Sequence, residues 1–175
     1  MATYKDYQPN KNDDFFTTEK SWLQISKIIN KYIDPKLIVS MPFYSPYSKC
    51  NEILGKYIKN KIIYQDEDFF NFDRGDIVID NPSFSNKSDI LETLYKRNKP
   101  FMLILPVSSM CYKYYRNIFK DNEKDISFLI FNGRPNYIKC DPKTGSLRED
   151  GKSPAFDSII FCYKIELPNN IMFLE

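Results

Sequence analysis

Short apolar segments of strand length alternate with amphipathic segments of helical spacing along most of this sequence. Strands are predicted over residues 37–41, 61–65, 76–80 and 101–106. Helices, in which apolar residues recur every three or four positions, are predicted over residues 19–33, 50–57 and 89–96. Because this alternation is typical of parallel strands connected by helices, it predicts an α/β fold with an open, mostly parallel sheet.

The order of the elements changes after Ser108. One tyrosine-rich helix and three closely spaced strands are predicted there, over residues 111–119, 126–131, 136–140 and 157–165. A turn and a polar loop separate these strands, and strands that follow one another so closely usually pair antiparallel. The predicted sheet is therefore mixed, mostly parallel with an antiparallel edge.

The chain of 175 residues is long enough for one sizeable core and too short for several domains. Residues 1–14 are polar and charged, which predicts a flexible N-terminal lead, and residues 15–175 are predicted to form a single domain. No apolar segment reaches the roughly 18 to 20 residues that span a bilayer, and the start has no apolar signal region. We therefore expect a cytoplasmic protein without a membrane partner.

Histidine is absent from the sequence, which excludes catalytic systems that use an imidazole and nearly every common catalytic zinc site. The four cysteines are widely spaced and form no CxxC pair, so we expect reduced, structural thiols and no metal site; they are Cys50, Cys111, Cys140 and Cys162. The formal net charge of +2 permits a local basic surface but does not by itself indicate nucleic-acid binding.

The tip that follows the predicted strand 76–80 carries residue types suited to chemistry. It reads Asn81, Pro82, Ser83, Phe84 and lies between a buried strand and a helix, where open α/β sheets bind ligands. Asparagine offers a side-chain oxygen, proline a backbone carbonyl and phenylalanine a face for stacking. The alternative is an ordinary strand-to-helix turn in which Ser83 or a neighbouring serine caps the helix.

This tetrapeptide, in its setting, resembles the catalytic motif of adenine-N6 methyltransferases, which is Asn, Asp or Ser followed by two prolines and an aromatic residue. Further segments resemble the small phage-type (Dam-like) DNA methyltransferases in the same order: residues 15–18, 86–106, 132–138 and 151–163. The resemblance implies a Rossmann-like class I methyltransferase fold. It also implies a phage or viral enzyme of the host cytoplasm that uses S-adenosylmethionine to methylate a flipped adenine in DNA.

The resemblance gives the catalytic role to Asn81, Pro82 and Phe84. The N6 lone pair of adenine is delocalised into the ring, so hydrogen bonds to the Asn81 side-chain oxygen and the Pro82 carbonyl would draw N6 towards tetrahedral geometry. Phe84 would stack on the flipped base. Ser83 stands where the family has its second proline, which loosens the loop and adds an N–H donor.

For the cofactor, S-adenosylmethionine, the resemblance implies contacts from an early aromatic element and two strand ends: Phe16, Thr17, Pro42, Phe43, Asp66, Asp68 and Phe69. Asp66 is the candidate for the ribose hydroxyls. Met41 replaces the family's acidic residue, however, and Ser45 and Tyr47 replace its glycines. Either the cofactor lies differently or it does not bind. Separately, the alternative for Asp66, Glu67 and Asp68 is a solvated acidic loop.

Contacts with DNA are predicted from Arg134, in the turn 132–135, and from Lys87, because such cations reach backbone phosphates. Solvated surface side chains are the alternative. Two other functions stay open. One is a catalytically degenerate methyltransferase-fold binding protein of a phage, with an anti-restriction or other anti-defence role and a host defence protein as its partner. The other is methylation of RNA or protein.

Overall fold

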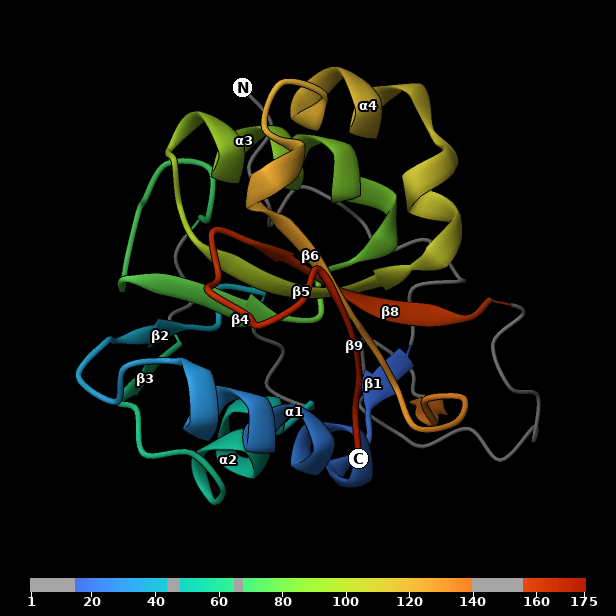
Figure 1. Ribbon diagram of the computed structural model, residues 1–175. Coiled ribbons are helices and arrows are strands. Elements are labelled where there is room, and N and C mark those ends of the chain that lie inside the picture. The colour runs from blue at the N-terminus through green and yellow to red at the C-terminus, as the bar shows by residue number, and fades with distance from the viewer. Residues whose placement is uncertain (1–14, 44–47, 65–67, 140–155) are drawn as a thin grey trace.

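The computed structural model describes residues 15–43, 48–64, 68–139 and 156–175. These residues form three layers, a central sheet with helices on both faces (Figure 1). Helices α1 (Glu19–Tyr32) and α2 (Cys50–Gly55) cover one face, and α3 (Lys87–Lys96) and α4 (Lys113–Phe119) cover the other. The predicted flexible lead, residues 1–14, lies outside the described residues.

Within the described ranges, the central sheet has seven strands and is mostly parallel. Its order is β3 (Ile62–Ile63), β2 (Val39–Ser40), β4 (Ile77–Asp80), β5 (Phe101–Pro106), β8 (Ser158–Tyr163), β6 (Ile126–Ile130), β9 (Ile171–Phe173). The first four strands run parallel, whereas β8 runs antiparallel to both β5 and β6. The predicted α/β fold, with a mixed sheet that is mostly parallel and turns antiparallel towards one edge, is confirmed.

Each helix and strand named in the sequence-based prediction is present, although β2 and β3 are only two residues long. Short 3-10 turns at η2 (Phe84–Asn86), η3 (Val107–Cys111) and η4 (Glu123–Asp125) lead into α3, α4 and β6. No helix in the described part of the chain is long and apolar enough to span a membrane. Three cysteines are free thiols, and Cys140 lies outside the described residues.

Alternate residues of the central strands build two cores, one on each face of the sheet. Val39, Ile77 and Met102 pack with Trp22 of α1 on one face. Val78, Leu103 and Phe161 pack with α3 and α4 residues on the other. Because both faces of β4, β5 and β8 are covered, these strands are apolar at nearly every position, which explains why they were predicted well from sequence.

A second, two-stranded sheet was not predicted. Strand β1 (Phe15–Thr17) pairs antiparallel with β7 (Tyr137–Lys139), and Thr17 lies opposite Tyr137. The sequence placed residues 136–140 beside the preceding strand through the turn at 132–135. Instead β8 takes the place next to β6, and β7 pairs with β1 from the other end of the sequence. Two three-residue strands carry no local pattern that could indicate this long-range pairing.

The chain enters β4 through Gly75, a glycine with a positive φ that lies against the backbone of the segment around β2. Gly75 has φ +66°, and a Cβ placed on it would lie 2.9 Å from the Ile38 carbonyl oxygen. We expect Gly75→Ala to lower the free energy of unfolding by about 2 to 4 kcal/mol, because a strained backbone angle and a steric clash add together. Urea unfolding measures this change.

Gly133 provides the matched control for the Gly75 substitution. It also has a positive φ, +82°, but a Cβ there would meet nothing within 4 Å. Gly133→Ala should therefore lower the free energy of unfolding by only about 1 kcal/mol, because the left-handed backbone is the only source of strain. Equal losses for the two variants would contradict the steric part of this prediction.

Candidate active site at the carboxyl ends of β2 and β4

The strand order places a ligand-binding position between β2 and β4. From β2 the chain goes to β3 on one side and then crosses to β4 on the other side of β2. From β4 the chain goes on to β5, on the side away from β2, so the connections that follow β2 and β4 run in opposite directions. This reversal is the switch point, the position at which open α/β sheets bind ligands. Ser40 and Asp80 are the last residues of the two strands.

Asn81, the first predicted catalytic residue, has one satisfied and one unsatisfied polar atom. Its Nδ2 donates a 2.9 Å hydrogen bond to Thr17 Oγ1, and Thr17 is only 1% exposed. Its Oδ1 is buried and has no hydrogen-bond partner among the described residues. Thr17, a predicted cofactor contact, accepts from the Asn81 amide and orients it, so the Asn81 oxygen remains as an acceptor at the strand tip.

The other two predicted catalytic residues follow directly. Pro82 is buried, and Phe84 begins η2 and is half-buried. The Phe84 ring meets the Phe156 ring edge to face, with centroids 5.0 Å apart and planes at 80°. The strand, the buried proline and this ring contact fix the tip in one conformation.

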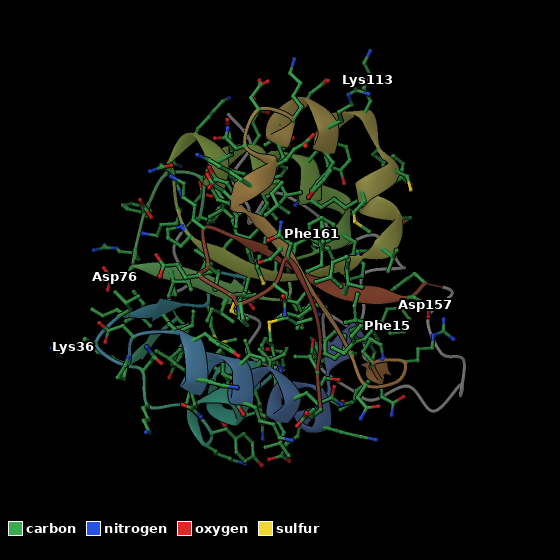
Figure 2. The ribbon with its side chains drawn as sticks, viewed as in Figure 1. Phe15, Lys36, Asp76, Lys113, Asp157 and Phe161 are labelled. Carbon is green, nitrogen blue, oxygen red and sulfur yellow. The ribbon has the colours of Figure 1, made fainter. Side chains whose placement is uncertain are left out.

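Phe84 belongs to a cluster of four half-buried rings that come from distant parts of the sequence. Phe156 also contacts Phe15 at 6.0 Å and Tyr137 at 5.8 Å between ring centroids. The labelled side chains of Phe15 and Asp157 lie at the same end of the sheet (Figure 2). Sequence reasoning missed Phe15, Tyr137 and Phe156, although all three lie in segments that carried the family resemblance.

Phe16 does not join this cluster. It lies between Phe15 and Thr17 on β1, and successive strand residues point to opposite faces. Phe15 contacts the aromatic cluster and Thr17 contacts Asn81, so Phe16 projects from the other face of β1. The structure thus brings Thr17 to the motif and leaves its neighbour, another predicted cofactor contact, away from it.

Asp80, the last residue of β4, connects the carboxyl ends of β2 and β4 through hydrogen bonds. Its Oδ2 accepts a 2.8 Å hydrogen bond from the Phe43 backbone N–H, and its Oδ1 accepts a 2.8 Å bond from the Asn81 N–H. Burial raises the pKa of this carboxyl from 3.8 to about 7, although the two hydrogen bonds oppose the rise. From the sequence, Asp80 is a flank of the motif that could also help to polarise or orient Asn81; the structure shows that it bonds the Asn81 backbone.

Three predicted cofactor residues line one small cavity of about 20 Å³ beside the ends of β2 and β3. They are Pro42, Asp68 and Phe69. The Asp68 carboxylate accepts hydrogen bonds from the Phe70 N–H and the Asn71 side chain. Phe43 is buried, and its ring packs 4.9 Å from that of Phe69. Asp66, the ribose candidate, lies outside the described residues.

Arg97, which the sequence did not single out, shapes the same cavity. Its guanidinium donates hydrogen bonds to the carbonyl oxygens of Phe69, Phe70 and Phe72, and it lies 5.1 Å from the Phe69 ring centroid. One cation therefore holds the whole segment that carries Phe69. Nothing in the local sequence could reveal this role, because Arg97 follows α3 and its partners precede β4.

The two predicted DNA contacts hold neighbouring parts of the site. Lys87 Nζ donates to the Phe84 carbonyl at 3.2 Å and lies 5.3 Å from the Tyr112 ring centroid. Arg134 Nε pairs with Asp157 at 2.8 Å, and its Nη2 donates to the Phe156 carbonyl at 3.2 Å. Both cations lie beside the aromatic cluster, and their contact with DNA stays a prediction.

No family model matches this chain, and no curated protein matches it in sequence. Solved structures do resemble its fold. A protein from Listeria monocytogenes assigned to the class I S-adenosylmethionine-dependent methyltransferases has a TM-score of 0.56 at 11% identity, over 97% of this chain and 67% of that chain. A protein from Pyrococcus horikoshii assigned as an RNA methyltransferase has a TM-score of 0.49 at 12% identity, over 93% and 91%.

A precorrin-6y C5,15-methyltransferase from Geobacter metallireducens has a TM-score of 0.47 at 11% identity, over 89% of this chain and 96% of that chain. At such identities the likeness concerns the fold, which can host unrelated substrates. The topology and the match to the Listeria structure together identify the chain as having a Rossmann-like class I methyltransferase fold.

Proposed function

We propose that this protein is an S-adenosylmethionine-dependent adenine-N6 DNA methyltransferase of phage type. The observation that carries the proposal is the buried, unpaired Asn81 Oδ1 beside an aromatic cluster, at the switch point of a methyltransferase fold. A buried acceptor without a donor is costly, and a ligand N–H would satisfy it. The amino group of an aromatic amine such as adenine offers this N–H donor, and its planar ring can stack on the aromatic cluster.

The chain supplies hydrogen-bond acceptors and a stacking surface for the reaction. Asn81 Oδ1 accepts one N6 hydrogen, and the Pro82 carbonyl accepts the other, so the N6 lone pair turns away from the adenine ring. S-adenosylmethionine supplies an electrophilic methyl group on a sulfonium. With both N6 hydrogens held by Asn81 and Pro82, the N6 lone pair would be free to take up that methyl group, and the proton lost from N6 would pass to solvent.

Described residues at the ends of β2 and β3 offer contacts for the adenosine part of the cofactor, and the cavity of about 20 Å³ would have to widen to admit it. The Asp68 carboxylate, which accepts from the Phe70 N–H and the Asn71 side chain, is the kind of acceptor that an adenine amino or ribose hydroxyl group needs. Phe69 and Val78 give the same cavity an apolar wall. Pro42 would lie beside the bound cofactor at the end of β2.

The four-ring cluster supports a flipped base as the substrate. Phe84 comes from the motif, and its neighbours come from β1, β7 and the segment before β8, so the rings form a common apolar surface next to Asn81. Stacking on aromatic side chains stabilises a base outside the duplex. Lys87 and Arg134 lie at the border of this surface and would contact phosphates on either side of the base.

A methyl-transfer assay tests the proposal directly. Purified protein, incubated with AT-rich duplex DNA and S-adenosylmethionine carrying a labelled methyl group, should produce N6-methyladenine, detected by mass spectrometry of digested DNA. Unlabelled RNA should compete poorly. Label in RNA or in protein, with none in DNA, would reject the proposed substrate while keeping the methyltransferase activity.

One observation favours a second candidate, a degenerate methyltransferase-fold binding protein that acts against host defence. Met41, which follows β2 where the resembling family has an acidic residue, is 2% exposed and packs in the core. It leaves that strand end without a carboxylate for the cofactor. Calorimetry separates the candidates: binding of S-adenosylmethionine at micromolar concentration supports the enzyme, and no heat of binding at millimolar concentration supports the degenerate protein.

A further inference from the structure

We infer that Asp80 is a positioning residue whose carboxylate holds the catalytic tip and the loop after β2 in one fixed arrangement for methyl transfer. The inference rests on the proposed function, because it assigns Asn81 to the substrate and the loop after β2 to the cofactor. It concerns a residue outside the tetrapeptide, one that acts through the backbone of two other residues.

The geometry of Asp80 links two segments that are far apart in sequence. Oδ2 accepts from the Phe43 N–H, 37 residues earlier, and Oδ1 accepts from the adjacent Asn81 N–H, both at 2.8 Å. Phe43 follows β2 and Asn81 follows β4, so the carboxyl bridges the two strand ends that flank the switch point. The side chain is 4% exposed, so water cannot replace these bonds.

The two bonds can be made at full strength together only by an ionised carboxyl. In the carboxylate each oxygen is an acceptor, which matches two N–H donors. A carboxyl oxygen that carries a proton is a hydrogen-bond donor. At Asp80 this O–H would face a backbone N–H, which is also a donor. Protonation of Asp80 therefore weakens one of the two links and frees either the Phe43 loop or the Asn81 backbone.

The surroundings set the pH at which this change occurs. Burial raises the pKa of Asp80 to about 7, a pH at which methyl transfer can be assayed. One titratable group that faces Asp80 is the Cys50 thiol of α2, whose pKa rises to about 11 through burial and through the Asp80 charge. Trp22 and Thr17, which also contact Cys50, do not titrate. Of these groups, Asp80 is therefore the one that gains or loses a proton near pH 7.

Activity and stability should respond to acid in opposite directions. Because the native pKa of Asp80 lies above its unfolded value of 3.8, protonation favours the folded state, and this group adds stability as pH falls from about 7 towards 4. Methyl transfer should nevertheless decline over the same interval, because the link is lost. If Asp80 affected only stability, activity would not fall over the pH interval in which stability rises.

Asp76 offers a matched control at the other end of the same strands. Its Oδ2 accepts a 2.7 Å hydrogen bond from the Ile38 N–H, so it too is a carboxylate that ties a backbone amide before β2 to the β4 side. Figure 2 shows Asp76 at the end of the sheet opposite Phe15 and Asp157. Asp76→Asn should show any general effect of neutralising such a carboxylate without touching the site.

The experiment combines the pH profile of kcat with NMR of the backbone amides. In the wild type, the Phe43 and Asn81 amide shifts should titrate together near pH 7, and kcat should fall about tenfold per pH unit below that midpoint. Asp80→Asn, which keeps one acceptor, should lower kcat about tenfold at pH 8 and remove the titration between pH 6 and 8. Asp76→Asn should keep the wild-type profile.

Three outcomes would overturn the inference: amides that do not titrate near pH 7, an Asp80→Asn profile identical to wild type, or an equal loss in Asp76→Asn. If Asp80→Asn fails to fold, the amide titration and pH profile of the wild type still decide the matter. If both amides titrate but no methyl group is transferred to any substrate, the link exists and it is the proposed function that fails.

Discussion

Asn81→Ala is expected to lower kcat for adenine methylation by about 100- to 1000-fold, with little change in the affinity for S-adenosylmethionine. The reason is that the Asn81 oxygen is buried, unpaired and preorganised, so its hydrogen bond to N6 strengthens as charge develops on that nitrogen. Loss of one such preorganised group typically costs about 3 to 4 kcal/mol of transition-state stabilisation. Single-turnover kinetics with labelled cofactor measures this loss.

Two further variants test whether the fall in kcat comes from the lost hydrogen bond of the Asn81 oxygen. Asn81→Asp keeps an acceptor oxygen and should retain more activity than the alanine variant. Asn169→Ala, an exposed asparagine in the turn before β9, should be indistinguishable from wild type in kcat and in melting temperature. Equal activity of Asn81→Ala and wild type would remove the observation on which the proposed function rests.

Phe84→Ala is the second substitution with a large expected effect, a fall of about 5- to 150-fold in kcat/KM for DNA. This range corresponds to the roughly 1 to 3 kcal/mol that a stacked base gains from an aromatic side chain. Part of the effect will come through Phe156, because its ring loses the 5.0 Å contact with Phe84. Steady-state methylation over a range of DNA concentrations measures kcat/KM.

The controls separate stacking from general loss of apolar surface. Phe84→Tyr keeps the ring and should keep most of the activity. Phe173→Ala removes a phenylalanine that is 75% exposed on β9, at the far edge of the sheet, and should leave kcat/KM unchanged. If Phe84→Ala binds and methylates DNA as the wild type does, the aromatic cluster is a packing feature and the substrate lies elsewhere.

The central layers of the fold could be predicted because each element carries its own signal. The segment from Phe101 to Pro106 is apolar at every position, which indicates a strand covered on both faces. Helix α1 repeats apolar residues at the spacing of one helical face, with Trp22 and Ile25 buried. In both cases the local pattern and the tertiary environment agree.

The pairing of β1 with β7 could not be predicted in the same way. Each strand has only three residues, so neither shows an alternation long enough to read. The turn at 132–135 predicted a hairpin with β6 instead. That hairpin does not form, because β8 pairs with β6 along four residues and occupies its edge.

The sequence by itself determined the layered α/β fold and the tetrapeptide after β4, since hydrophobic periodicity and residue chemistry are local properties. Only the tertiary structure decided which groups meet at that tetrapeptide. Thr17 meets Asn81, the Phe156 ring meets Phe84, and Asp80 reaches the Phe43 backbone. Such contacts depend on strand order and on which side chains share a buried space, and residues 37 or more positions apart carry no joint signal in one sequence.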